Sequence, residues 1–331
     1  MLFVDNQGVT DARRNLALEE YVLRHAPGDE DYLLFYVNAP AVIIGRNQNT
    51  VEEIDPAVVA ERGVTVVRRL SGGGAVYHDR GNLNFSFHTP HAAERFNRYD
   101  AFLKPVLAVL RDLGIPAELG GRNDVTVEGR KVSGNAQFTT TRRMFSHGTL
   151  LVDANLDAVT AVLRPRPGKV ESKGVKSVRA RVANLAEFAP GLTVERLRAL
   201  ILERIFGAAE AARAPALPLG AAEWAAVDAL VAERYGNDAW TYGEDPPSDV
   251  RRAVRTAAGE LDVRLGVAGG RITAARVYGD FQGPRDVAEL ERLLLGAPYT
   301  REGVEAALAG VDVAAYFGAV TREEVVGVVA G

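Results

Sequence analysis

The chain contains no cysteine among its 331 residues. This absence excludes disulfide bonds, cysteine-ligated zinc and thiol nucleophiles. Long hydrophobic runs are missing too, because no apolar stretch reaches the roughly 18 residues that a membrane helix needs. The N-terminus also lacks the basic start and apolar segment of a signal peptide. We therefore expect a cytoplasmic protein with no membrane partner.

A strong excess of charge of one sign is absent as well. The formal net charge is −4, with 25% charged and 47% hydrophobic residues, so we expect a globular protein without a general attraction to nucleic acid. One local excess occurs in residues 164–181, where Glu171 is the single acid. This segment is either a solvated basic loop or a surface that binds a phosphate or an acidic partner. Its basic residues are Arg164, Arg166, Lys169, Lys173, Lys176, Arg179 and Arg181.

Common motifs for nucleotides and metals are not found. Gly129-Arg-Lys-Val-Ser-Gly134 has the wrong spacing for a Walker A loop, and no Gly-x-Gly-x-x-Gly precedes a predicted helix. His88 and His91 lie on either side of Pro90, which breaks a helix, so they cannot share a helical face. A Rossmann cofactor site and a zinc site are therefore not expected.

The most informative stretch that is present, residues 68–88, contains three consecutive glycines. A basic, β-branched run precedes them and an alternating apolar run, Leu83–Phe87, follows, so the pattern predicts strand, tight turn and strand. Glycine lets a ligand approach the main chain closely, and successive N–H groups beside arginines form an anion-binding concavity. Taken alone, the loop is either such a site or a structural turn.

Three further blocks carry polar residues in strand-like surroundings. Residues 122–137 predict a strand, a Glu128-Gly129 turn and a return strand that carries Lys131. His147–Asp153 is again strand-like, and residues 173–185 alternate basic or polar residues with apolar ones.

Together the four blocks resemble the lipoate-protein ligases. The chain contains Arg-x-Ser-Gly-Gly-Gly-Ala-Val-Tyr-His-Asp, Gly-Arg-Asn-Asp followed by Lys-Val-Ser-Gly, His-Gly-Thr-Leu-Leu, and Ser-Val-x-x-Arg-Val-x-Asn-Leu, in the family's order. The resemblance covers essentially the whole chain, including a C-terminal accessory region. The Gly-Arg-Gly-Arg-x-Gly-Arg loop of biotin ligases is not found.

The resemblance implies an α+β fold. We expect a large domain with mixed β-sheets flanked by helices, as in biotin and lipoate ligases and class II synthetases, and a small α+β C-terminal domain. The catalytic domain is predicted for residues 1–241 and the accessory domain for 249–331, joined by a turn-rich linker at 242–248.

Hydrophobic periodicity and turn residues predict the individual elements. Helices are expected at 11–25, 100–113, 156–163, 194–206, 221–234 and in short pieces over 286–329. Strands are expected at 32–37 and 41–44, and a hairpin with a Gly269-Gly270 turn joins 261–267 to 272–277. Pro105 is expected in the first turn of its helix or at a kink.

The resemblance also implies roles for individual residues. Lys131 is expected to contact both the acyl carboxylate and the α-phosphate of ATP, and so to be the catalytic residue. Asp124 is expected either to hold a metal ion or to position Lys131. The remaining candidates are Arg69, Gly74, Ala75, Val76 and Tyr77 for ATP, and Ser71, Gly73, Gly74, His147 and Gly148 for lipoate. An apolar tunnel lined by Val76 and Phe85 is expected to take the dithiolane chain.

The implied reaction activates lipoate with ATP and Mg²⁺ and then acylates a lysine, without a tightly bound organic cofactor. The implied acceptors are the lipoyl domains of 2-oxoacid dehydrogenase acyltransferase subunits and the glycine cleavage H protein. Related transferases that form a thioester need a cysteine, which this chain lacks. Two alternatives remain: a lipoyl or octanoyl transferase that uses a preformed acyl-adenylate, and a binding protein without activity.

Overall fold

The chain forms two compact units. The computed structural model describes residues 1–121, 123–164, 181–208, 214–243 and 248–331. The first unit consists of residues 1–43, 52–67 and 76–241, and the second of residues 44–51, 68–75 and 242–331. Two short segments of the predicted catalytic part therefore fold with the C-terminal residues, and the functional division at 1–241 and 249–331 stays a prediction. Most of the basic segment and the middle of the predicted linker lie outside the described residues.

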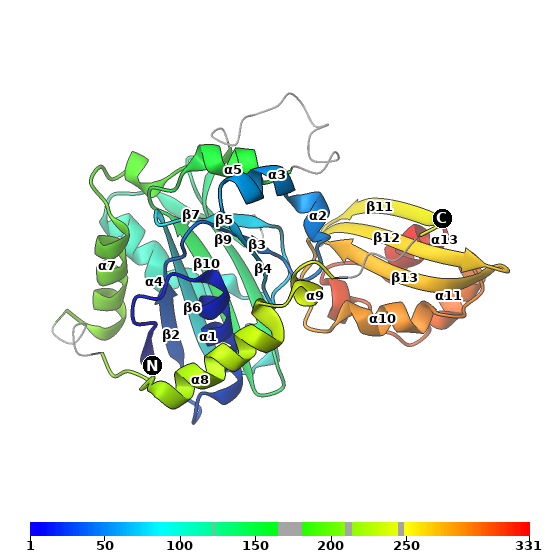
Figure 1. Ribbon diagram of the computed structural model, residues 1–331, viewed down its shortest axis with the longest axis horizontal. Coiled ribbons are helices and arrows are strands. Elements are labelled where there is room, and N and C mark those ends of the chain that lie inside the picture. The colour runs from blue at the N-terminus through cyan, green and yellow to red at the C-terminus, as the bar shows by residue number, and fades with distance from the viewer. Residues whose placement is uncertain (122, 165–180, 209–213, 244–247) are drawn as a thin grey trace. The chain divides into compact units, whose positions relative to one another are not determined.

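A seven-stranded sheet forms the centre of the first unit (Figure 1). Its first pair of strands is parallel and the other neighbouring pairs are antiparallel. This mixed sheet confirms the predicted fold class. In spatial order, the strands are β1 (Leu2–Asp5), β2 (Tyr32–Tyr36), β6 (Asn82–Pro90), β10 (Arg143–Leu151), β9 (Arg130–Thr139), β8 (Asp124–Val127) and β7 (Ala117–Gly120).

Both faces of the sheet are buried, which explains why β2 is apolar at every position. Leu33 and Phe35 belong to one core, and Tyr32, Leu34 and Tyr36 to another, because successive side chains point to opposite faces. Helices α4 (Tyr99–Asp112) and α7 (Val194–Phe206) cover the first core, whereas α1 (Ala12–His25) and α8 (Ala221–Leu230) cover the second.

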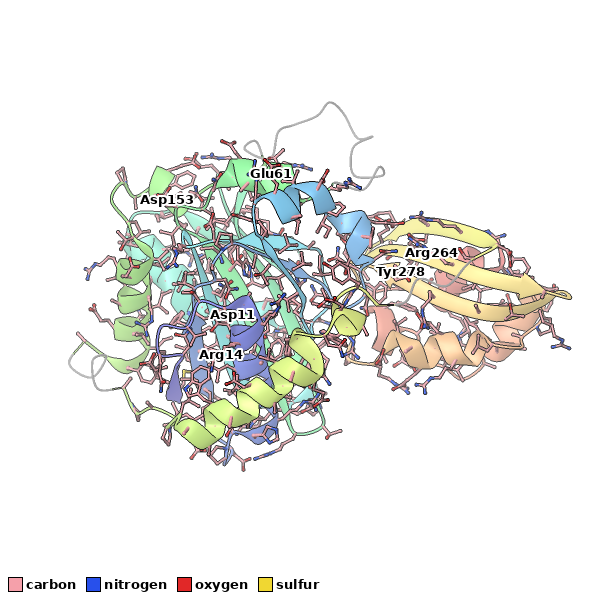
Figure 2. All side chains as sticks on the ribbon, in the orientation of Figure 1. Asp11, Arg14, Glu61, Asp153, Arg264 and Tyr278 are labelled. Atoms are coloured by element: carbon pink, nitrogen blue, oxygen red, sulfur yellow. The ribbon has the colours of Figure 1, made fainter. Side chains whose placement is uncertain are left out.

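Helix α1 begins at Asp11, whose carboxylate accepts a hydrogen bond of 2.8 Å from the N–H of Arg13 (Figure 2). Arg14 in its first turn pairs with Asp228 of α8 at 2.8 Å and stacks 4.7 Å above the ring of Trp224. The predicted helix is therefore confirmed, and its exposed edge is tied to α8.

Helix α4 also matches its prediction, and of the two positions expected for Pro105 the first turn is excluded. This proline lies in the middle of the helix and not in its first turn. Proline cannot donate to the carbonyl of Ala101, but Ala101 is exposed, so water can supply that hydrogen bond. Gly114 follows the helix with a φ of 77°, the left-handed conformation that ends many helices.

A small sheet in the order β4-β3-β5 accompanies the large one. It consists of β4 (Thr65–Arg68), β3 (Ala41–Ile44) and β5 (Val76–His78), and its apolar residues join the second core. In the described residues before 242, the other helices are α2 (Thr50–Glu53), α3 (Pro56–Glu61), α5 (Leu156–Val162) and α9 (Asp238–Thr241). This part of the chain also contains 3₁₀ turns at Ala93–Arg95 and Leu185–Glu187 and a π turn at Val231–Tyr235.

The C-terminal part of the second unit is a three-stranded antiparallel sheet with short helices. The sheet consists of β11 (Val250–Thr256), β12 (Gly259–Ala268) and β13 (Arg271–Gly279), and the helices are α10 (Val287–Leu294), α11 (Arg301–Ala307), α12 (Ala314–Phe317) and α13 (Arg322–Ala330). Gly269 and Gly270 form the predicted turn with φ of 57° and 72°. Strand β11 was not predicted, because this edge strand is rich in arginine and largely exposed.

A cation–π contact joins neighbouring strands of this small sheet. The Arg264 guanidinium lies 4.7 Å from the ring centre of Tyr278 on the neighbouring strand (Figure 2).

Across all residues that the structure describes, no helix is both long and apolar enough to cross a membrane.

Candidate active site

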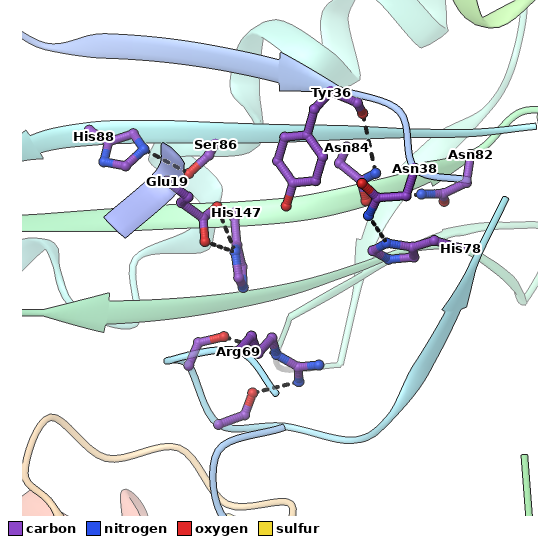
Figure 3. Close-up of polar contacts among 12 residues, drawn as sticks. Glu19, Tyr36, Asn38, Arg69, His78, Asn82, Asn84, Ser86, His88 and His147 are labelled. Carbon is purple, nitrogen blue, oxygen red and sulfur yellow. Dashed lines mark hydrogen bonds and ion pairs between the residues drawn. The ribbon is translucent and has the colours of Figure 1, made fainter. Parts of the chain in front are cut away.

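The glycine loop, which we define as residues 69–75, is organised by its own arginine. The guanidinium of Arg69 donates to Ser71 Oγ at 3.0 Å and to the carbonyls of Gly72 and Gly74 at 2.7 and 2.9 Å (Figure 3). Arg69 is only 6% exposed. The structure therefore gives this residue a clear role within the loop, while its contact with ATP stays a prediction.

The neighbouring Arg68 was missed by the sequence reasoning. Its buried guanidinium donates to the carbonyls of Gly45, Arg46 and Gln48 at 2.7 to 2.9 Å, and to Thr50 Oγ1 at 2.7 Å. One cation thus holds the whole 45–50 loop. The available signal was the pair of arginines at the end of a β-branched run, since alternate strand positions point to opposite faces.

The three glycines of the loop have different surroundings. A Cβ on Gly72 would lie 2.3 Å from the carbonyl oxygen of Phe281, and one on Gly73 would lie 2.9 Å from the Arg69 guanidinium. Gly73 also has a φ of 91°. Gly74 has no other atom within 4 Å of such a Cβ and no left-handed φ. Only Gly74 can therefore accept a side chain without disturbing the loop itself.

Gly74→Ala is therefore expected to preserve folding and to weaken ATP binding, if phosphate approaches the main chain here. A Cβ on a phosphate-contacting glycine removes close backbone hydrogen bonds, so we expect a loss of about 1 to 3 kcal/mol of ATP binding. Isothermal calorimetry with ATP, together with thermal melting, checks this. An unchanged ATP affinity would mean that Gly74 serves the turn alone.

Val76 and Tyr77 follow in strand β5 of the first unit. Val76 packs at the second core, and Tyr77 is 8% exposed. Burial, followed by the charge of Asp79, raises the pKa of the Tyr77 hydroxyl above its ordinary value, so this group stays neutral near pH 7. These side chains are directed into the fold, which leaves the backbone as the part that ATP could contact.

Lys131 forms an ion pair with Asp124. Lys131 Nζ lies 2.8 Å from Asp124 Oδ1, and both side chains are more than a third exposed. Strands β8 and β9 bring the two together around the predicted turn, where Glu128 and Gly129 adopt φ of 51° and 73°. A Cβ on Gly134 would lie 2.8 Å from Lys131 Nζ. This glycine therefore leaves room for the lysine ammonium.

Segment 181–185 lies directly beside Lys131. The carbonyl of Lys131 accepts a hydrogen bond of 2.9 Å from the N–H of Ala183, and Lys131 and Val182 form a parallel bridge. This polar segment of the fourth sequence block is therefore fixed next to the candidate catalytic lysine.

A buried pair of a glutamate and a histidine lies between α1 and the large sheet. Glu19 is 2% exposed, and its carboxylate lies 2.9 and 3.0 Å from His147 Nδ1 (Figure 3). Burial alone would raise the pKa of Glu19, but the charge and hydrogen bond of His147, together with His88, hold it below its ordinary value. His147 is thus oriented by a carboxylate that the sequence reasoning did not identify.

His88 lies on the same face, fully buried, with its Nε2 3.1 Å from Ser86 Oγ. Burial lowers the pKa of His88 from 6.5 to about 4. His88 is therefore neutral at physiological pH.

This shift predicts a pH dependence of stability. Below 6.5 the unfolded chain binds a proton at His88, whereas the folded chain does so only near 4, so the free energy of unfolding falls as the pH falls through this window. The expected contribution is on the order of 3 kcal/mol. Urea unfolding of the wild type and of His88→Gln from pH 7 to 4 should show the shallower slope for the variant. Equal slopes would refute the assignment.

His147 and Gly148 point to opposite faces of β10. A Cβ on Gly148 would lie 2.0 Å from Asn135 Oδ1 and 2.6 Å from the ring of Phe85, so this position is tightly packed. Phe85 belongs to the first apolar core and Val76 packs against the second, and the tunnel that these residues were expected to line stays a prediction.

The predicted site residues are divided between the two units. Arg69, Ser71, Gly73, Gly74 and Ala75 belong to the second unit. The first unit contains Val76, Tyr77, Asp124, Lys131, His147 and Gly148. Within the first unit, Lys131 with Asp124 and His147 with Glu19 form the polar pairs.

Comparisons with known proteins identify the family of the chain. Residues 11–206 match the family described as the lipoyl protein ligase A/B catalytic domain, and residues 245–329 match the bacterial lipoate protein ligase C-terminus. The chain is 47% identical to the lipoate-protein ligase LplJ of Bacillus subtilis, over 98% of each chain.

Solved structures show the same relationship. An archaeal bi-partite lipoate protein ligase from Thermoplasma acidophilum is 30% identical with a TM-score of 0.64, covering 75% of this chain and 98% of its own. A lipoate-protein ligase A bound with ATP is 26% identical with a TM-score of 0.61, covering 73% and 98%. The chain belongs to the lipoyl protein ligase A/B family.

Proposed function

We propose that this chain activates lipoate with ATP and transfers the lipoyl group to a lysine of an acceptor domain. The observation that carries the proposal is the full-length likeness to a lipoate-protein ligase, which includes both the catalytic and the C-terminal family matches. The similarity to a ligase bound with ATP supports ATP as the second substrate.

In the first step, the lipoate carboxylate attacks the α-phosphorus of ATP. A new phosphorus–oxygen bond forms as the bond to pyrophosphate breaks, giving lipoyl-AMP. Two anions must meet for this to occur, so a cation between them stabilises the transition state. Lys131 fits that role, because its ammonium is accessible and is held by a carboxylate it can leave. The backbone N–H groups of the glycine loop fit the phosphates.

In the second step, the ε-amine of the acceptor lysine attacks the acyl carbon and AMP leaves. The acceptor ammonium must first lose a proton from a reference pKa of about 10.4. Close positioning of amine and adenylate supplies much of the acceleration. No covalent intermediate on the enzyme is required, which suits a chain without cysteine.

Mg²⁺ is expected to arrive bound to ATP. Among the residues that the structure describes, no three metal-binding side chains converge on one point. Mg²⁺ commonly uses one or two carboxylates together with substrate phosphates and water, and Asp124 is a suitable single carboxylate. We further propose that the acceptors are lipoyl domains of 2-oxoacid dehydrogenase complexes and the glycine cleavage H protein, in the cytoplasm.

The test has two readouts. Pyrophosphate release with lipoate and ATP alone measures adenylation, and intact-mass spectrometry of an added lipoyl domain measures transfer. We expect both activities with lipoate, and a mixed reaction with octanoate measures which of the two acids is preferred. Modification only when lipoyl-AMP is supplied would identify a transferase, and no modification at all would identify a binding protein.

A further inference from the structure

Within the second unit, the glycine loop rests on a segment from the C-terminal part of the chain. This support segment, residues 279–286, connects strand β13 to helix α10. Phe281 is fully buried and Gln282 is 5% exposed. Both residues lie beside the glycine loop, so the loop packs against a segment that is far away in the sequence.

The absence of side chains at Gly72 and Gly73 permits this close contact. A Cβ on Gly72 would lie 2.3 Å from the carbonyl oxygen of Phe281, which is backbone and cannot move aside cheaply. A Cβ on Gly73 would lie 3.1 Å from Gln282 Nε2. These two glycines therefore admit the support segment, whereas Gly74 has open space.

Two polar contacts fasten the segment to the adjacent 45–50 loop. Arg46 Nη2 lies 2.6 Å from Asp286 Oδ2 in an ion pair, with the Arg46 side chain 23% exposed and that of Asp286 44% exposed. The N–H of Gly279 donates to the carbonyl of Asn47 at 2.8 Å. The N–H of Arg46 in turn donates to the carbonyl of Ser71 at 2.9 Å, so the contact continues into the glycine loop.

Asp286 also caps helix α10, so the carboxylate that pairs with Arg46 is held by a second contact. Its other carboxylate oxygen, Oδ1, accepts from the N–H of Ala288 at 3.0 Å and caps helix α10. The helix thus fixes the carboxylate, and the carboxylate fixes Arg46. The Asp286 side chain therefore connects helix α10 to the 45–50 loop.

We propose that the support segment is a positioning element for ATP, which holds the glycine loop through Gly72, Gly73 and the Arg46–Asp286 pair. The inference rests on the proposed function, since it assigns the loop to ATP phosphates. Preformed backbone donors stabilise charge without reorganisation, so loss of the support raises the KM for ATP. The transfer step from lipoyl-AMP no longer involves pyrophosphate and depends less on this geometry.

Asp286→Asn is the first test, because asparagine keeps the helix cap but removes the charge. We expect about a 2- to 5-fold higher KM for ATP in the pyrophosphate assay, the range of a partly exposed ion pair. Gly72→Ala is the second test, with an expected loss of roughly 10- to 100-fold in adenylation from a displaced loop. Asp286→Asn should transfer the lipoyl group from supplied lipoyl-AMP within about 2-fold of wild type.

Arg285→Gln provides the matched control. Arg285 belongs to the same segment, but its guanidinium pairs with Glu289 and lies 4.7 Å from the ring centre of Tyr316. Its KM for ATP should match the wild type. A wild-type KM for ATP in Asp286→Asn and Gly72→Ala would overturn the positioning role, as would equal losses of adenylation and transfer in Asp286→Asn. Failure of the wild type to release pyrophosphate would instead overturn the proposed function.

Discussion

Lys131→Ala is expected to reduce lipoate adenylation by about 100-fold or more, because the two reacting anions then lack a cation between them. The fold should survive, since the Lys131–Asp124 pair is partly exposed and such pairs contribute about 0 to 1 kcal/mol. Lys131→Arg should remain poor, because a planar guanidinium cannot replace a compact ammonium between carboxylate and phosphate. Pyrophosphate release at saturating ATP and lipoate measures both effects.

Arg130→Gln is the control for this prediction. Arg130 precedes Lys131 in the same strand, but its guanidinium pairs with Glu187 at 2.7 Å and lies over the ring of Phe188. Its removal should change adenylation by less than about 2-fold. If Lys131→Ala adenylates lipoate within a few-fold of wild type while remaining folded, another group performs the chemistry.

Asp124 can be separated from Lys131 by the same assays. If Asp124 only positions the ammonium, Asp124→Asn should keep a hydrogen bond to Lys131 and lose little activity at any Mg²⁺ concentration. If Asp124 also binds the metal, the activity of the variant should recover as Mg²⁺ is raised.

Strand β6 shows where sequence patterns reach their limit. Leu83, Phe85 and Phe87 alternate with polar residues, a pattern that predicts a half-exposed strand. The alternation and the strand are confirmed, but Asn84, Ser86 and the other polar positions are buried too. Alternation reports two different environments and cannot say that one of them is water. The buried polar face could be recognised only from the tertiary structure, in which Glu19 of α1 contacts His147 of the neighbouring strand β10.

The glycine loop was also predictable only in part. Its order of strand, turn and strand follows from local sequence and was predictable. The role of Gly72 was not predictable, because its close neighbour Phe281 lies more than 200 positions away in the printed sequence. Motif residues were found from the sequence because they resemble a family, whereas Arg68, Glu19 and Asp286 required tertiary contacts.

A chain truncated after Thr241 is expected to lose ATP-dependent ligation by about 100-fold or more, but to retain transfer from supplied lipoyl-AMP. The first unit has two apolar cores of its own, which contain no residue beyond 241, so it should fold. Residues 44–51 and 68–75, however, belong to the second unit and would lose Phe281, Gln282 and Asp286. The glycine loop would then be present without its support.

Adding residues 249–331 as a separate chain should restore part of the adenylation. This C-terminal part has its own buried core, which includes Leu261, Leu290 and Phe317, so it can fold alone. The same C-terminal chain carrying Asp286→Asn is the control and should restore less. The truncated chain could instead be fully active with ATP and lipoate at wild-type stability. The glycine loop would then bind ATP without Phe281, Gln282 and Asp286, so the C-terminal residues would be dispensable for adenylation and the support segment would not position the loop.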